Sequence, residues 1–242
     1  MLTEERKKEI KTNIGRIKSE MAQAKEKSPY GQDTVLLAAT KTRTAEEINY
    51  AIECGITRIG ENRVQEMLER YDDINRDKVA FDFIGALQTN KVKYIIDKVD
   101  MIQSVDRLEL AREIDRQAKK HNLVMDILVE INIGGEQSKS GIAPEDAESF
   151  IREISSFEGI KIKGLMSIPP ICTDIDKQKN YFKKIMNIFI DISAKKIDNV
   201  DMSILSFGMS DDYMLGIECG STMVRVGTAI FGARDYTKKQ MN

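Results

Sequence analysis

Lys41 stands where an amine can do covalent chemistry. It follows the apolar run 35–40 and precedes residues 42–47, which have the composition of a helix start. An amine at the exit of a buried strand loses part of its solvation, which lowers its pKa and makes it a nucleophile toward carbonyl carbon. Lys41 is therefore a candidate for a Schiff base, and pyridoxal phosphate (PLP) is the commonest aldehyde cofactor held in that way. Because most lysines at strand ends are simply solvated, other residues must support this chemistry.

Two turns late in the chain have the composition of anion-binding sites. Segments 206–212 and 225–229 are small-residue turns that enter expected helices, so free backbone N–H groups and a helix dipole would face an anion. Ser210 and Thr228 add hydroxyl groups, and Gly227 lets the backbone approach a ligand closely. Taken singly, each hydroxyl is equally well explained as a helix cap. In a parallel barrel, however, both turns would follow the last two strands, where phosphate often binds.

Arg225 and Asn62 are further candidates. Arg225 lies between two valines in an expected strand, so the alternation of side chains places it inside a barrel and the valines against the helices. A buried guanidinium needs an acceptor, which is either a carboxylate in an interior ion pair or the ring nitrogen of a cofactor, kept unprotonated by this donor. Glu61 and Asn62 follow the second expected strand beside Lys41. Asn62 either hydrogen-bonds the phenolic oxygen of a cofactor or forms a turn.

The composition argues against several other kinds of site. The 242 residues contain 37 Lys and Arg and 39 Asp and Glu, a net charge of −2, so neither nucleic acid nor a membrane is expected as a partner. There is one histidine, and the three cysteines form no CxxC pair. A catalytic triad, a metal site and structural disulfides are therefore not expected. No apolar leader or long apolar run is visible, and we expect a cytoplasmic protein.

Alternating apolar runs and amphipathic stretches predict the fold. Residues 3–27 have apolar residues at helical spacing. Eight short apolar runs follow, mostly separated by stretches long enough for a helix. The expected strands are 35–40, 56–60, 81–87, 101–105, 125–131, 160–168, 202–207 and 222–226. This pattern favours one α/β domain over residues 1–242, a (β/α)₈ TIM barrel with an extra N-terminal helix (1–28) packed on it. A doubly wound open sheet is the alternative.

Seven motifs in order along the chain resemble one protein family. They are LLAATKTR, GENRVQE, FIGALQTNK, SVDRLELA, GLMSIPP, LSFGMSDD and GSTMVRVGTAIFGAR. The chain thus resembles the YggS/PROSC family of pyridoxal phosphate homeostasis proteins, whose members look like the N-terminal barrel of alanine racemase, the fold type III of PLP proteins.

The resemblance implies a role for each candidate residue. It implies that PLP forms a Schiff base with Lys41, that Asn62 lies beside the cofactor and that Arg225 meets the ring nitrogen. The phosphate would be held by Ser210, Gly227 and Thr228. Two departures from the family pattern are Phe81-Asp82, where an aromatic–histidine pair is common, and Phe207, where a methionine is common. Neither is at a cofactor position, so we expect both to affect only details of the cavity mouth.

The sequence also bears on catalysis. Racemisation of an amino acid needs an acid/base group on each face of the substrate. In the racemases that this barrel resembles, a tyrosine from a second, β-rich domain supplies one of them, and the residues after the eighth expected strand are too few for such a domain. The seven tyrosines fall mostly in helical or terminal segments.

We therefore expect no catalytic residue and a carrier that buffers or delivers PLP in PLP and amino-acid homeostasis. Its partners would be PLP and apo PLP-dependent enzymes, and it would be a monomer, or alternatively a weak dimer. Two other functions stay open. One is a small PLP-dependent racemase that uses a helix-borne tyrosine, Cys54 or Cys172 as its second base. The other is a barrel enzyme that binds a sugar phosphate as an imine on Lys41.

Overall fold

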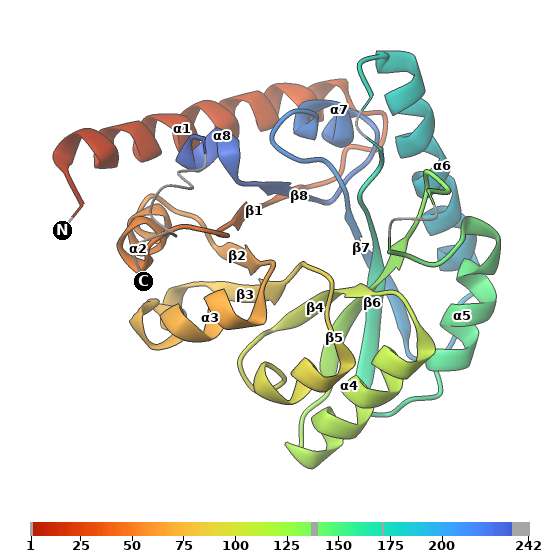
Figure 1. Ribbon diagram of the computed structural model, residues 1–242. Helices are drawn as coiled ribbons and strands as arrows, with labels where there is room; N and C mark the ends of the chain where they lie inside the picture. Colours follow the sequence, from red (N-terminus) through yellow and green to blue (C-terminus); the bar gives the residue numbers. More distant parts are fainter. Residues whose placement is uncertain (1, 137–139, 171, 234–242) are drawn as a thin grey trace.

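The apolar runs form strands that pair in parallel, and most of these strands are buried on both faces, as is usual in a parallel sheet. The structure is a computed structural model that describes residues 2–136, 140–170 and 172–233. The strands are β1 (Val35–Ala39), β2 (Arg58–Glu61), β3 (Ala80–Phe83), β4 (Met101–Val105), β5 (Met125–Ile131), β6 (Ile160–Ser167), β7 (Val200–Ser206) and β8 (Met223–Val226). Consecutive strands pair, and β8 pairs with β1, so the sheet closes (Figure 1). The barrel prediction is confirmed and the open sheet is wrong.

Helices cover the outside of the barrel (Figure 1). They are α1 (Glu4–Lys27), α2 (Ala45–Glu53), α3 (Val64–Arg70), α4 (Leu108–Lys120), α5 (Ala147–Ile154), α6 (Ile175–Ala194), α7 (Tyr213–Glu218) and α8 (Thr228–Phe231). Short 3₁₀ turns are η1 (Tyr71–Asp73), η2 (Arg76–Lys78), η3 (Thr89–Tyr94) and η4 (Pro144–Asp146). Between β3 and β4 the connection contains η3 rather than an α-helix.

The third strand is shorter than its apolar run predicts. It ends at Phe83, although Ile84 and Leu87 are also buried. Residue 85 packs backbone against backbone on Asn62, since a Cβ at Gly85 would lie 2.1 Å from the carbonyl oxygen of Asn62. The run therefore leaves the ladder to cross the rim of the barrel, and apolar composition alone does not mark that point.

The N-terminal helix α1 packs along α7, α8 and α2 (Figure 1). Its apolar face is buried, and the residues that form it are Ile10, Ile14, Ile17 and Ala24. The side chain of Asn13 donates to the carbonyl oxygen of Ile230 at 2.9 Å, and Arg6 donates to Glu47 at 2.9 Å. The extra helix therefore joins the first and last β–α units.

The strands separate two cores by the alternation of their side chains. Outward-facing residues such as Val224 and Val226 belong to a large apolar core beneath the helices. Inside the barrel are two small apolar groups that both contact Ile204. They are Leu37, Ala39, Ile84 and Met223, and Met101, Leu128 and Met166. The same interior also buries polar side chains from four strands, namely Asp82, Gln103, Ser206 and Arg225. A polar interior of this kind is unusual for a barrel, where bulky aliphatic residues dominate.

Candidate functional site

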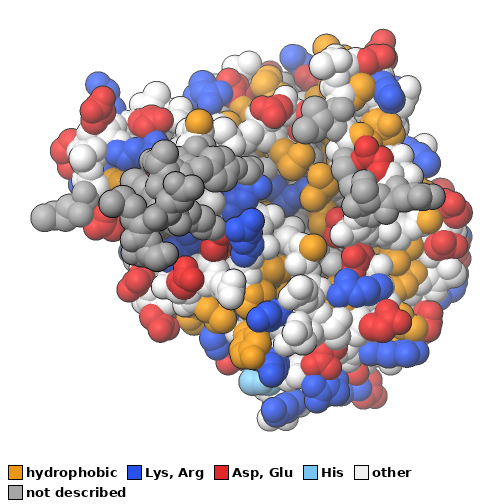
Figure 2. All heavy atoms as spheres, in the orientation of Figure 1, with side chains coloured by type: hydrophobic (Ala, Val, Ile, Leu, Met, Phe, Trp, Pro, Cys, Tyr) orange, Lys and Arg blue, Asp and Glu red, His pale blue; other side chains and the backbone are white. Residues whose placement is uncertain are grey.

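One cavity lies at the carboxyl ends of β1, β2, β7 and β8. Its volume is about 350 Å³, and its lining residues are Ala39, Lys41, Arg43, Asn62, Ile84, Ile168, Met209, Ser210, Asp211, Arg225, Gly227 and Thr228. All six residues that the sequence nominates as cofactor contacts are in this lining. The face drawn in Figure 2 is hollowed near its centre, where Lys and Arg side chains gather beside hydrophobic ones.

Lys41 is carried by the short loop between β1 and α2. Its neighbour Thr40 is fully buried, and the hydroxyl of Thr40 contacts the carbonyl oxygen of Gly60 at 3.1 Å and the carboxylate of Glu61 at 2.5 Å. On the other side, Thr42 has φ of 65° and donates its N–H to Glu66 at 3.0 Å. A β-branched residue in the left-handed region is strained, so the surrounding contacts must hold this conformation. Lys41 is thus fixed from both sides while its own side chain remains half-buried.

Glu61 and Arg70 clamp this loop to the second β–α unit. Glu61 is fully buried, and burial raises its pKa, whereas the positive charge of Arg70 opposes that rise. The guanidinium of Arg70 forms an ion pair with Glu61 and also donates to the carbonyl oxygen of Arg43. Sequence reasoning placed Glu61 beside Lys41 but missed Arg70, because nothing local in α3 indicates which carboxylate it meets.

Asn62 presents a hydrogen-bonding group that the protein leaves unused. Its Oδ1 is buried and has no hydrogen-bond partner among the described residues. Buried polar atoms are almost always paired, so an unpaired one in a cavity lining needs an explanation. A ligand with a hydroxyl or phenolic group beside Asn62 would provide that partner.

The turns after β7 and β8 meet at Ser210. The hydroxyl oxygen of Ser210 accepts from the N–H groups of Gly227 and Ala229, both at 3.2 Å. Gly227 is close to β1, since a Cβ there would lie 3.1 Å from the carbonyl oxygen of Ala39. Thr228 is exposed at the start of α8. Hydroxyl groups and backbone N–H groups from two turns therefore converge at one end of the cavity.

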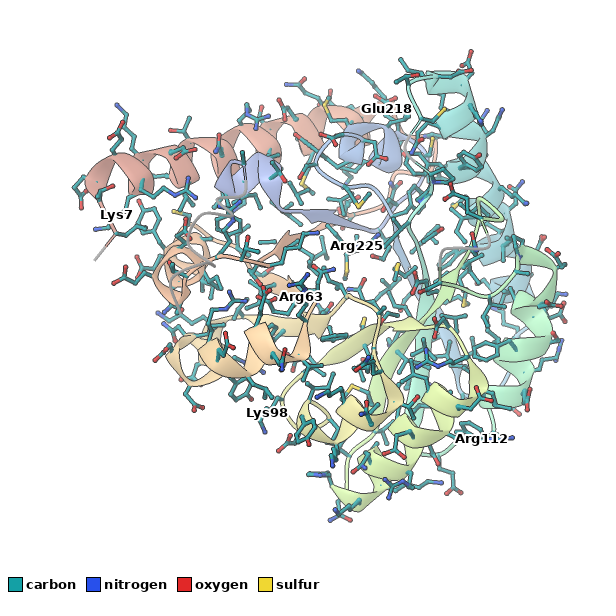
Figure 3. The ribbon with its side chains drawn as sticks, viewed as in Figure 1. Lys7, Arg63, Lys98, Arg112, Glu218 and Arg225 are labelled. Carbon is teal, nitrogen blue, oxygen red and sulfur yellow. The ribbon has the colours of Figure 1, made fainter. Side chains whose placement is uncertain are left out.

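Arg225 lies in the middle of the barrel, as Figure 3 shows. Its Nη1 donates to the carbonyl oxygen of Ser206 at 2.9 Å and to the hydroxyl of Ser206 at 2.6 Å, and its Nη2 donates to the carbonyl oxygen of Ser167 at 2.9 Å. Burial lowers the pKa of Arg225 to about 10, against the opposing charges of Glu130 and Asp212. The side chain is therefore charged at neutral pH. Three of its five N–H donors are used in the described part of the chain, which leaves two for a ligand.

Glu130 is a buried carboxyl group that the sequence did not single out. It is on the face of β5 that points into the barrel, as is Leu128. Burial and the negative charge of Asp106 raise the pKa of Glu130 to about 7, and Arg225 opposes the shift. The signal for it was present, because a glutamate in the apolar run 125–131 must point into a polar interior.

The two departures from the family pattern lie away from the cavity mouth, contrary to expectation. Asp82 is fully buried inside the barrel, where it pairs with Arg58 at 2.8 Å and accepts from Gln103 at 2.6 Å. Burial raises the pKa of Asp82 to about 6 while Arg58 opposes the shift. Phe207 is also buried, and its ring stacks on Phe182 with centroids 4.7 Å apart.

The candidate second bases of a racemase do not line this cavity, whose acid/base groups in the described part are Lys41 and Asp211. Cys54 caps the end of α2. Cys172 and Tyr213 line a neighbouring cavity of about 490 Å³, which shares Asp211 with the first. The phenol of Tyr213 donates to Glu20, and burial raises its pKa to about 12.

No helix among the described residues is both long and apolar enough to cross a membrane. They also contain no group of three or more His, Cys, Asp or Glu side chains arranged to hold a metal ion.

Comparison with known proteins identifies the family. The model of the alanine racemase N-terminal domain matches residues 12–235. A pyridoxal phosphate homeostasis protein from Aquifex aeolicus is 39% identical over 224 residues, covering 92% of this chain and 97% of the relative. That from Haemophilus influenzae is 37% identical over 234 residues, covering 96% of this chain and 98% of the relative.

Solved structures share the barrel. A crystal structure of an unknown protein from Bifidobacterium adolescentis has a TM-score of 0.90 and 35% identity, covering 96% of this chain and 98% of the other. PipY from Synechococcus elongatus, solved with PLP bound, has a TM-score of 0.79 and 26% identity, covering 92% of this chain and all of PipY (100%). An alanine racemase from Clostridium difficile shares the fold at 18% identity and a TM-score of 0.71, with 95% of this chain matched to 58% of the racemase.

PLP, the cofactor expected from the motifs, is thus the ligand in a solved relative. The family match covers most of the chain, and the relatives that exceed one-third identity match it nearly end to end. The chain belongs to the pyridoxal phosphate homeostasis protein family, which is built on the alanine racemase N-terminal domain.

Proposed function

We propose that this protein binds PLP in the cavity at the ends of β1, β2, β7 and β8, holds it as a Schiff base on Lys41, and buffers or delivers it in PLP and amino-acid homeostasis. The observation that carries the proposal is the convergence of all six nominated residues on one cavity of about 350 Å³. That volume lies in the range of about 300–1,000 Å³ usual for small-molecule sites.

The lining fits the functional groups of PLP. The amine of Lys41 suits the aldehyde, and the buried Oδ1 of Asn62, which has no partner among the described residues, can accept from a phenolic hydroxyl. Arg225 has N–H donors left for the ring nitrogen, and the turns that meet at Ser210 suit the phosphate. When bound, the cofactor supplies an electrophilic aldehyde carbon and an electron-withdrawing ring.

The charge on Arg225 favours storage over carbanion chemistry. Its pKa of about 10 keeps the guanidinium protonated at neutral pH. A permanent donor at the ring nitrogen leaves that nitrogen unprotonated, which weakens the ring as an electron sink. We propose that the site therefore holds its cofactor without efficient turnover.

The first test is reductive trapping. Protein incubated with PLP should turn yellow, and borohydride should fix the mass of the reduced cofactor on the peptide that contains Lys41. Lys41→Ala should lose this adduct completely, whereas Lys120→Ala, at an exposed lysine at the end of α4, should retain it. A colourless protein that traps a sugar phosphate instead would support the alternative barrel enzyme.

Delivery needs a separate test. We propose that apo PLP-dependent enzymes are recipients and that the protein acts as a monomer. Loaded protein mixed with an apo enzyme should restore its activity even when an excess of a PLP scavenger is present. Restoration that the scavenger abolishes would indicate release into solution, and sedimentation velocity of the loaded protein would show whether a weak dimer forms.

The racemase alternative has one observation in its favour, because Asp211 lines the same cavity as Lys41. A racemase would exchange the Cα hydrogen of an amino acid with solvent. Incubation with L-alanine and other amino acids in D₂O should give little deuterium at Cα if the protein is a carrier. Rapid exchange that is lost in Asp211→Asn would establish the racemase instead.

A further inference from the structure

A row of hydrogen bonds crosses the barrel interior from Arg225 to β2. Nη1 of Arg225 donates to the hydroxyl of Ser206 at 2.6 Å, and that hydroxyl donates to Oε1 of Gln103 at 2.9 Å. Nε2 of Gln103 donates to Oδ2 of Asp82 at 2.6 Å. Asp82 also accepts from Arg58 at 2.8 and 3.0 Å. The row therefore joins β8, β7, β4, β3 and β2, and it ends on an arginine that is partly exposed.

The chemistry of the two ends fixes the direction of every bond in the row. Arg225 can only donate, so the hydroxyl of Ser206 must accept from it and pass its own hydrogen on. Gln103 must then accept with its oxygen and donate with its nitrogen. The carboxylate of Asp82 completes the row because it can only accept when it is ionised. No member can turn round without leaving a buried group unpaired.

The hydrogen bonds of the row are buried in a largely apolar environment. Asp82, Gln103 and Ser206 are fully buried (0% exposed), and Arg225 is 4% exposed. The other contact of Gln103 is the sulfur of Met223 at 3.1 Å, an apolar residue of the barrel interior. Polar bonds in such a setting are strong when complete and costly when broken. An all-aliphatic interior would avoid this cost, so packing alone does not explain why these polar residues are buried here.

We infer that Asp82 and Gln103 are positioning residues, which act through Ser206 to hold the guanidinium of Arg225 against the ring nitrogen of bound PLP. The inference rests on the proposed function. Nη1 of Arg225 has two acceptors on Ser206, and only the hydroxyl can rotate. Gln103 fixes that rotation, and Asp82 fixes the orientation of Gln103. The donors of Arg225 that face the cavity therefore keep one direction.

The test compares PLP with an analogue in which the ring nitrogen is replaced by C–H. Dissociation constants for both ligands are measured by absorption with the wild type and with Gln103→Leu. Gln103→Leu removes both bonds that Gln103 makes in the row, so the guanidinium of Arg225 should lose its alignment with the ring nitrogen. Loss of that one charged hydrogen bond should weaken PLP binding about tenfold while changing the affinity for the analogue less than about twofold. Gln117→Leu is the matched control, since Gln117 is a buried glutamine on the outer helix α4. It should leave both ligands unchanged.

A second pair of variants reverses one bond of the row. Gln103→Glu places a carboxylate against Asp82 and should weaken PLP selectively. Combining it with Asp82→Asn restores one donor and one acceptor at that contact, so PLP affinity should return to within about twofold of wild type. If Gln103→Leu does not fold, the comparison of Gln103→Glu with the double variant still tests the positioning role.

The outcomes separate the two proposals. Equal weakening of PLP and the analogue, unchanged binding of both, or no recovery in the double variant would overturn the positioning role. Wild-type protein that binds neither ligand would instead overturn the proposed function itself.

Discussion

Lys41 and Arg225 line the same cavity, but a loop carries one and a strand carries the other. Lys41 is half-buried beside a left-handed threonine, and bonds from the next β–α unit hold its loop in place. Arg225 is buried in β8, and three bonds to neutral oxygen atoms fix it. An amine that reacts with an incoming ligand is suited to a loop, because loops can adjust their position. A side chain that orients the ring of a bound ligand is better held on a rigid strand.

The largest loss of stability should come from removing Arg70, which holds the loop that carries Lys41. Arg70→Ala leaves the fully buried carboxylate of Glu61 without its ion-pair partner, and such a loss costs about 3 kcal/mol or more of the free energy of unfolding. Equilibrium unfolding in urea measures this loss. Arg63→Ala removes an ion pair whose arginine is 68% exposed, and it should cost only about 0.5 kcal/mol. An equal loss of unfolding free energy in the two variants would show that the Glu61–Arg70 ion pair contributes no more than a surface ion pair.

The stability of the barrel interior around Arg225 should depend on pH through Glu130 in β5. Its pKa is about 7 in the folded protein, whereas an unfolded glutamate titrates at about 4.3. Between these values the folded chain binds more protons than the unfolded one, so stability falls as the pH rises and the loss is complete above the folded pKa.

Glu130→Gln should remove this dependence. It should exceed the wild type by about 3 kcal/mol in the free energy of unfolding at about pH 8 and match it at about pH 4. Denaturant unfolding at several pH values measures the difference. Glu158→Gln, at a side chain 87% exposed, is the control. A gain that is the same at every pH would mean that Glu130 does not titrate in this window.

The smallest effect should come from Thr42→Gly. Glycine tolerates the φ of 65°, and the change also removes a buried hydroxyl with no partner in the described residues. We expect a gain of about 0.5–1 kcal/mol in thermal unfolding. Asn122 has a φ of 54° that asparagine already tolerates, so Asn122→Gly should change little. Destabilisation by Thr42→Gly would mean that the loop is not strained.

What the sequence predicts well is whatever depends on local pattern. The strand exits placed Lys41 and the two turns that carry Ser210, Gly227 and Thr228 at the cavity, and alternation placed Arg225 inside the barrel. Arg70 could not be assigned to Glu61 because that pairing depends on how α3 packs. Asp82 was linked to the cavity mouth only as a departure from the family pattern, whereas the structure places it within β3, where it pairs with β2 inside the barrel.

The seam between β1 and β8 has a consequence for how the chain reaches this structure. The first strand pairs with the last, and α1 buries its apolar face on helices that flank that last strand. While the protein is being synthesised, α2 is made soon after α1, but most of the partners of that face lie in α7 and α8, near the end of the chain. Closure of the barrel is therefore a late, long-range event, and much of the apolar face of α1 stays exposed on the nascent chain until then.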